Sequence, residues 1–110
     1  MDIVDFLVTR FQEDISEARK LLASSNVSLS DRWYEERLLK ECETKLMLIE
    51  IIGGARRHAL SRMVLDEDDD EDPRFREELE WTRLALSALA AVHEDHPDFQ
   101  DGWRLTQESP

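Results

Sequence analysis

Apolar residues recur at helical spacing over most of this chain, beginning close to its N-terminus. The positions that repeat every three or four residues are Val4, Val8, Phe11, Ile15, Ala18 and Leu22. This spacing gathers them on one face of an α-helix. A second row of apolar residues, Ile3, Phe6, Leu7 and Leu21, widens that face. The pattern therefore predicts a first helix from Asp2 or Ile3 to Leu22.

The pattern breaks at residues 23–30, which are rich in serine and asparagine. A polar stretch without helical period indicates a connection between helices. Ser28 or Ser30 is a candidate N-cap, so a second helix is predicted to begin near Asp31. Its apolar positions are Trp33, Tyr34, Leu38, Leu39, Cys42, Leu46, Ile49 and Ile52. From Leu38 onward their spacing is helical.

The later turns of this second helix are apolar on nearly every side, because Met47, Leu48 and Ile51 join the stripe. We expect this portion to be the most buried. The Gly53-Gly54 pair then interrupts the pattern, and each glycine costs about 1 kcal/mol in a helix interior relative to alanine. Three outcomes are compatible with that cost: the helix ends at the pair, kinks there, or continues through residues 55–65.

Seven consecutive acidic residues occupy positions 66–72. Like charges at this density repel one another, which predicts a solvated loop. Asp72 and Pro73 then form the pattern of an N-cap followed by proline at the first helical position. A third helix is therefore predicted from Pro73 to about His93. One face of it carries Phe75, Leu79, Thr82, Leu86 and Leu89, and a neighbouring face carries Trp81, Ala85, Ala88 and Val92.

Two large aromatic residues, Phe99 and Trp103, follow the proline that stops the third helix. We expect segment 94–104 to fold back and dock both rings on the helices. The chain is then a single helical domain over residues 1–110: an all-α bundle of three helices with an acidic loop at 66–72. Glycine and proline number only three each, which is too few turn residues for a β-sandwich or barrel.

The formal net charge of −12 narrows the choice of partners. Binding to nucleic-acid phosphates requires Lys and Arg, and an anionic membrane surface repels an acidic chain. A basic protein partner is electrostatically favoured instead. No segment approaches ~18 consecutive apolar residues, so we expect no membrane span.

A single cysteine, Cys42, indicates the compartment. It can form no disulfide within the chain, which suits a reducing interior. The N-terminal residues lack the basic region and the apolar run of a signal peptide. We therefore expect the protein in the cytoplasm.

Three segments carry a further pattern. They are Phe6-Leu7 through Arg10 with Glu13-Asp14 and Ala18-Arg19, residues 37–45, and residues 84–89 followed by His96-Pro97-Asp98-Phe99 and Trp103-Arg104. In these residues the chain resembles an uncharacterised family of small actinobacterial and actinophage proteins, known as domain of unknown function 6221. The resemblance implies an actinobacterial or phage origin and no particular reaction. Members often carry a Cys-x-x-Cys segment before the last helix, which this chain lacks, so no metal role carries over.

His93 and His96, with carboxylates nearby, are candidate zinc ligands, because histidines three apart share a helix face. The alternative is a helix end at which His93 interacts favourably with the helix dipole and His96 begins a turn. The acidic run matches alternate positions of a calcium loop, but the glycine of the sharp turn is replaced by Glu71. We expect no cofactor and no catalytic residue.

The residues that we expect to contact a partner are Trp81, Arg56, Arg57, Asp68 and Asp70. The sequence reveals no reaction, and it favours a small acidic helical interaction protein, of phage or bacterial origin, that binds a protein partner. One alternative is a DNA mimic that inhibits a nucleic-acid-binding protein. Another is a metal-dependent enzyme using the region of His93 and His96.

The helices carry more apolar surface than a three-helix bundle needs, because each has a second apolar row beside its main stripe. Such a row requires a cover. Either the C-terminal segment or a second copy of the chain has to supply it. We therefore also predict a homodimer that packs through helices about a twofold axis.

Overall fold

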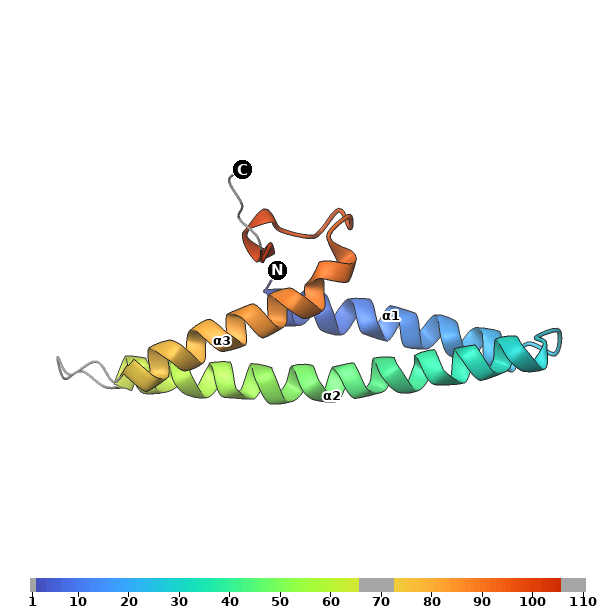
Figure 1. Cartoon of the computed structure of the whole chain (residues 1–110), viewed down its shortest axis with the longest axis horizontal. Coiled ribbons are helices and arrows are strands. Elements are labelled where there is room, and N and C mark those ends of the chain that lie inside the picture. Colours follow the sequence, from blue (N-terminus) through green and yellow to red (C-terminus); the bar gives the residue numbers. More distant parts are fainter. Residues whose placement is uncertain (1, 66–72, 106–110) are drawn as a thin grey trace.

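The computed structural model describes residues 2–65 and 73–105, and its regular structure within these ranges is helical. Three α-helices follow one another along the chain: α1 (Ile3–Ala23), α2 (Leu29–Leu65) and α3 (Pro73–Ala90). Two short 3-10 helices complete it, η1 (Ala91–His93) and η2 (Asp101–Trp103). The prediction of an all-α bundle of three helices is confirmed (Figure 1).

Helix α1 begins and ends close to its predicted limits. Asp2 is its N-cap, and the Asp2 carboxylate accepts a hydrogen bond from the backbone N–H of Val4 at 3.3 Å. Ser24 follows the last turn, where its backbone N–H donates to the Leu21 carbonyl. The predicted apolar face points inward, and its buried members are Ile3, Phe6, Leu7, Phe11, Ile15 and Ala18. The helix is thus fixed by a cap at one end and a continuous apolar face.

Helix α2 continues through the glycine pair for 37 residues. At 1.5 Å per residue it is ~55 Å long. It begins two residues before its predicted start, because the Ser28 hydroxyl accepts a hydrogen bond from the Asp31 N–H at 3.1 Å and caps it. Of the three outcomes open at Gly53 and Gly54, continuation is therefore the correct one.

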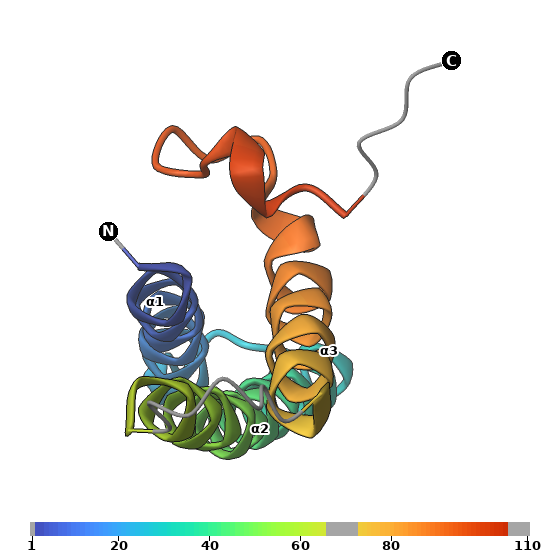
Figure 2. The ribbon, with the colours of Figure 1, turned by 90° about the vertical axis from the view of Figure 1, so that its left-hand side faces the viewer.

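The other two helices share α2 between them. Figure 1 shows α1 along the N-terminal half of α2 and α3 along its C-terminal half, and Figure 2 shows that they lie on different sides of it. The molecule consequently follows the length of α2 and measures 63 × 34 × 21 Å. Its radius of gyration is 17.9 Å, whereas a compact chain of this length would have about 13 Å. The bundle is therefore elongated and exposes much helix surface.

The C-terminal segment folds back over the ends of α1 and α3, above α2 in Figure 1. Phe99 and Trp103 pack against the core cluster. Both rings contact Phe6 of α1, with centroid distances of 6.2 Å and 4.9 Å. The predicted return of this segment is therefore present, and it joins the start of α1 to the end of α3.

The core lies where all three helices approach one another. Its most buried large side chains come from each helix, and they are Phe6, Leu7, Ile49, Leu86, Thr82 and Ser87. The later turns of α2 were predicted to be its most buried portion, and the buried residues Ile49 and Ile52 lie there, but burial is confined to one side of the helix. Met47 is 58% exposed and Ile51 is 68% exposed. The side of α2 that carries Met47 and Ile51 is exposed, because α1 and α3 pack on two other sides of the helix.

The acidic run at 66–72, with Asp68 and Asp70, lies outside the described residues, as does the calcium-like pattern within it. Within the described ranges, the structure contains no helix that combines the length and the apolar character of a membrane span.

Candidate functional site

Exposed apolar side chains of α3 and of the adjoining η1 form a row on the side away from the core. This row, which we call the outer face of α3, consists of Trp81, Leu84, Ala88 and Val92. Its members are three or four residues apart and therefore share one side of the helix. Trp81 is 47% exposed and Val92, in η1, is 73% exposed. Contiguous exposed apolar surface is a feature of interaction sites, whereas single exposed apolar residues are ordinary.

A second uncovered surface lies on α2. We call it the open side of α2, and it consists of Trp33, Tyr34, Leu38, Met47, Leu48 and Ile51. Trp33 and Tyr34 stack edge to face with centroids 4.9 Å apart, and the Arg37 guanidinium lies 5.6 Å from the Trp33 ring centroid. The aromatic pair is thereby held in place on the surface. Both features favour a preformed contact site.

The C-terminal segment does not cover either surface. Its aromatic residues pack against Phe6, near the N-terminus of α1. Trp81 and Ile51 keep the exposure given above while the segment is docked. The sequence left two possible covers for these surfaces, the C-terminal segment or a second copy. The C-terminal segment packs elsewhere and therefore does not cover them.

The predicted contact residues lie in different places. The Arg56 guanidinium pairs with the Asp2 carboxylate at 3.1 Å and so supports the N-cap of α1. Arg56 also lines a cavity of about 280 Å³ together with Arg83, Ser87 and Trp103. Trp81 does not line this cavity but lies on the outer face of α3.

The remaining basic residues near the end of α2 are partly engaged within the chain. Arg62 lies over the Phe75 ring at 5.7 Å from its centroid, and His58 meets the same ring edge-on. Arg57 is exposed. The structure thus brings the basic cluster against α1 and the start of α3, and not against Trp81.

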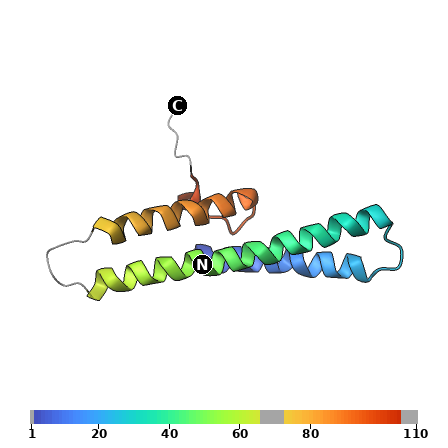
Figure 3. The same cartoon turned by 60° about the horizontal axis from the view of Figure 1, so that its bottom comes forward.

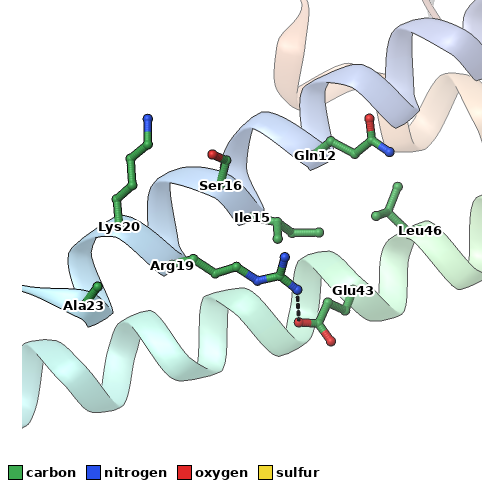
Figure 4. A pocket seen from close by; sticks show the side chains of 8 residues that line it. All are labelled: Gln12, Ile15, Ser16, Arg19, Lys20, Ala23, Glu43 and Leu46. Carbon is green, nitrogen blue, oxygen red and sulfur yellow. Dashed lines mark ion pairs between the residues drawn. The ribbon is translucent and has the colours of Figure 1, made fainter.

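An open pocket of about 720 Å³ lies between α1 and α2 (Figure 4). Figure 4 shows Arg19 reaching from α1 toward Glu43 on α2, and these two side chains form an ion pair at 3.7 Å. Ile15 and Leu46 form its apolar floor. The one carboxylate of the lining is paired with an arginine, so the pocket offers no catalytic arrangement of charged groups.

The two histidines of the C-terminal region line the docked segment. His93 meets Phe11 edge-on at 5.5 Å between centroids, and His96 meets Phe6 in the same way at 5.5 Å. Burial, with the nearby charges of Arg10 and His96, lowers the pKa of His93, against the opposing effect of Asp14. The neutral imidazole is thus the form that the fold favours.

Both ring nitrogens of His96 already have neighbours. Its Nδ1 accepts a hydrogen bond from the Asp98 backbone N–H at 3.0 Å, and its Nε2 faces the Arg10 guanidinium. A metal ion on Nε2 would have to displace that guanidinium. Across residues 2–65 and 73–105, no three His, Cys, Asp or Glu side chains gather as metal ligands. The geometry therefore favours the structural role of these histidines.

Cys42 lies in the core at 2% exposure. Burial raises the pKa of its thiol, and the carboxylate of Asp14 raises it further. A reactive thiol needs an electropositive, accessible setting. Cys42 therefore acts as a small core residue.

Sequence reasoning missed Arg10, which is 8% exposed. Its guanidinium lies over the Phe6 ring, pairs with Glu13 at 2.8 Å and contacts His96. The available signal was its position, since Arg10 lies on the same helix face as Leu7 and Phe6, three and four residues before it. Arginine at such a position can bury its stem while it holds the charged end in contact with partners.

These features define a class: an elongated, acidic, all-helical protein whose uncovered surfaces are apolar helix faces. The chain belongs to the family of unknown function DUF6221, whose profile matches residues 1–105. No curated protein and no solved structure matches it.

Proposed function

We propose that this protein acts by binding a protein partner through the outer face of α3 and the open side of α2. The observation that supports the proposal is the exposure of Trp81 and Val92 in a chain whose aromatic C-terminal segment is docked elsewhere. Tryptophan is one of the residues enriched among those that carry most of the binding energy of protein interfaces. The expected partner presents a helix, because helical rows bind helices by interdigitation of side chains.

The charge of the chain sets what the partner can be. With a formal net charge of −12, the protein attracts basic surfaces at long range and repels other acidic ones. A foreign partner is therefore expected to be basic around its contact helix. A second copy of the chain has to rely on local pairing of opposite charges.

The DNA-mimic alternative receives less support from the described residues. Mimicry requires unpaired carboxylates spread along one surface. In this structure several carboxylates are instead paired with arginines. Such pairs are Arg37–Glu41, Arg83–Glu80, Arg10–Glu13 and Arg19–Glu43. We therefore adopt the apolar surface as the basis of function.

We further propose that the protein works in the cytoplasm of an actinobacterium or of a phage-infected cell. The single thiol, Cys42, is buried and reduced, which suits a reducing compartment.

The proposal can be tested by affinity capture from an extract of the source organism. The tagged wild-type chain is compared with Trp81→Ala and Ala88→Glu, which alter the outer face of α3. Ser61→Glu is the matched control, because it adds the same charge at an exposed position of α2 that belongs to neither of the two surfaces. We expect a protein that the wild type and the control retain and that both outer-face variants lose. The proposal fails if no captured protein, a second copy included, depends on this face.

A further inference from the structure

We propose that the cavity of about 280 Å³ lined by Arg56, Arg83, Ser87 and Trp103 binds a small organic carboxylate. Figures 1 and 3 show the start of α1, the C-terminal half of α3 and η2 close together near the middle of α2. The cavity lies at this junction, and all four elements contribute to its lining. No residue of the outer face of α3 or of the open side of α2 belongs to it, so the site is separate from the proposed protein-binding surfaces.

The most buried polar side chain of the lining lacks a hydrogen bond. Ser87 is 2% exposed, and its hydroxyl has no hydrogen-bond partner among the described residues. The buried hydroxyl of Thr82, in the same helix, donates instead to the backbone carbonyls of Glu78 and Leu79 at 2.8 and 3.0 Å. Because a buried hydroxyl without a partner costs free energy, such groups usually bind something that enters the cavity. The Ser87 hydroxyl is therefore a free contact for a ligand.

The two guanidinium groups of the lining also keep unused donors. Arg56 binds the Asp2 carboxylate through Nη1 alone, at 3.1 Å from Oδ1. Arg83 binds the Glu80 carboxylate through Nε and Nη2, at 3.2 and 2.7 Å. A guanidinium has five N–H donors on three nitrogens. Nη2 of Arg56 and Nη1 of Arg83 thus remain without an acceptor among the described residues, and a ligand that supplies acceptor oxygens matches them.

The charge of the lining favours a ligand with a single negative charge. Its charged members are Arg56, Arg83 and Asp2, so the lining carries one positive charge more than negative in a chain of formal net charge −12. The pair of Arg83 with Glu80 is about half exposed, at 51% and 59%. Exposed pairs of this kind contribute little to stability. A ligand carboxylate can therefore replace Glu80 on Arg83 at small cost, whereas Asp2 stays in place because it caps α1.

The remaining wall is apolar and sets the shape of the ligand. Ile3, Leu86 and Trp103 line the cavity, and Gly102 leaves it open, because a Cβ at that position would meet no atom within 4 Å. Ligand pockets usually measure about 300–1,000 Å³, so this cavity suits an acid with a short apolar body. Planar carboxylates fit guanidinium groups through two parallel hydrogen bonds. Inorganic phosphate would match the donors but would leave the apolar wall unused.

The first experiment titrates benzoate into the full chain at low ionic strength. Nuclear magnetic resonance follows the indole N–H signals of Trp103, Trp33 and Trp81, of which only Trp103 lines the cavity. We expect benzoate to shift the Trp103 signal alone, and to bind about tenfold more tightly than acetate or inorganic phosphate because its ring covers apolar surface. An unchanged Trp103 signal overturns the proposal. Equal affinities for the three anions also overturn it, since they would show ion pairing without recognition of an organic acid.

The second experiment changes the proposed contacts in opposite directions. We expect Arg83→Gln and Ser87→Ala to weaken benzoate binding by about tenfold and about threefold, because each removes a donor. Glu80→Gln removes the competing carboxylate and should strengthen binding by about threefold. Arg37→Gln is the matched control, because Arg37 forms a similar exposed pair with Glu41 on α2 and does not line the cavity.

The pattern across these variants decides the assignment. A gain of affinity in Glu80→Gln together with a loss in Arg83→Gln cannot arise from damage to the fold, and circular dichroism checks that every variant remains helical. Arg37→Gln should bind benzoate as the wild type does. If Arg83→Gln and Arg37→Gln bind equally well, or if Glu80→Gln binds more weakly than the wild type, the carboxylate site is overturned. Neither result bears on capture of a protein through the outer face of α3.

Discussion

Phe6 and Trp103 pack against each other near opposite ends of the chain, with ring centroids 4.9 Å apart and planes inclined by 49°. Phe6 is fully buried, and its ring also meets Phe99 and His96 edge to face. One residue of α1 therefore organises most of the aromatic contacts of the C-terminal segment. Geometries of this kind add to the stabilisation that comes from burial alone.

Replacement of Trp103 by alanine should lower the free energy of unfolding. A fully buried tryptophan contributes about 3–5 kcal/mol, and Trp103 is only half-buried, so we expect a loss of about 2 kcal/mol. Urea denaturation of dilute protein measures the change. Trp33→Ala, which removes an exposed tryptophan of α2, is the control and should cost less than about 1 kcal/mol. Equal losses in both variants would show that the docked segment contributes nothing to stability.

Replacement of Gly53 or Gly54 by alanine should stabilise the protein. Both glycines lie inside α2, and a Cβ on Gly53 would meet the nearest Val4 methyl at 3.7 Å, an ordinary van der Waals contact. The loss of backbone freedom in the unfolded chain then dominates, and each change should add roughly 0.5–1 kcal/mol. Thermal unfolding measures the gain. A lower melting temperature for Gly54→Ala, where only the Arg57 side chain is near, would contradict this account.

His93 should make stability depend on pH. Because burial lowers the pKa of His93 in the folded state, the unfolded chain binds the proton more readily. The contribution of neutral His93 to the free energy of unfolding is fully present above the ordinary histidine pKa of about 6.5. It is lost as the pH falls below that value. As the pH falls below about 6.5, we expect the unfolding free energy of His93→Gln to decrease less than that of the wild type.

The matched control for that measurement is Ser61→Gln, which introduces the same side chain at an exposed position of α2. Its pH dependence should follow that of the wild type. A wild-type slope in His93→Gln would instead assign the effect to other groups.

The helices could be predicted from the sequence because their signals are local. Asp2 and Ser28 cap the helices that they precede, and the apolar rows of α1 and α3 point inward as their spacing predicts. Continuation of α2 through the glycine pair could not be predicted, since it depends on tertiary burial on both sides of the pair, of Ile49 and Ile52 before it and of Ala59 after it. Tertiary contact there outweighs a propensity cost of about 1 kcal/mol per glycine.

The candidate surface was only partly predictable. Trp81 was expected to contact a partner, and it is exposed on the outer face of α3. The later turns of α2 were expected to be the most buried, and Ile49 and Ile52 are buried there, whereas Met47 and Ile51 on another side of the helix are exposed. An apolar row shows that a cover is needed, but not which element supplies it. Which side of α2 receives α1 or α3 depends on contacts between residues far apart in the chain, which apolar periodicity does not reveal.

The sharing of α2 between its two neighbours has a kinetic consequence. Each pairing, α1 with α2 and α2 with α3, joins elements adjacent in the chain, so both can form early and independently. Closure of Trp103 onto Phe6 spans almost the whole chain and carries the largest loop entropy. It should therefore form after the rate-limiting barrier. We expect Trp103→Ala to speed unfolding while it leaves the refolding rate nearly unchanged in stopped-flow measurements, so that the contact acts as a latch that sets the lifetime of the native state.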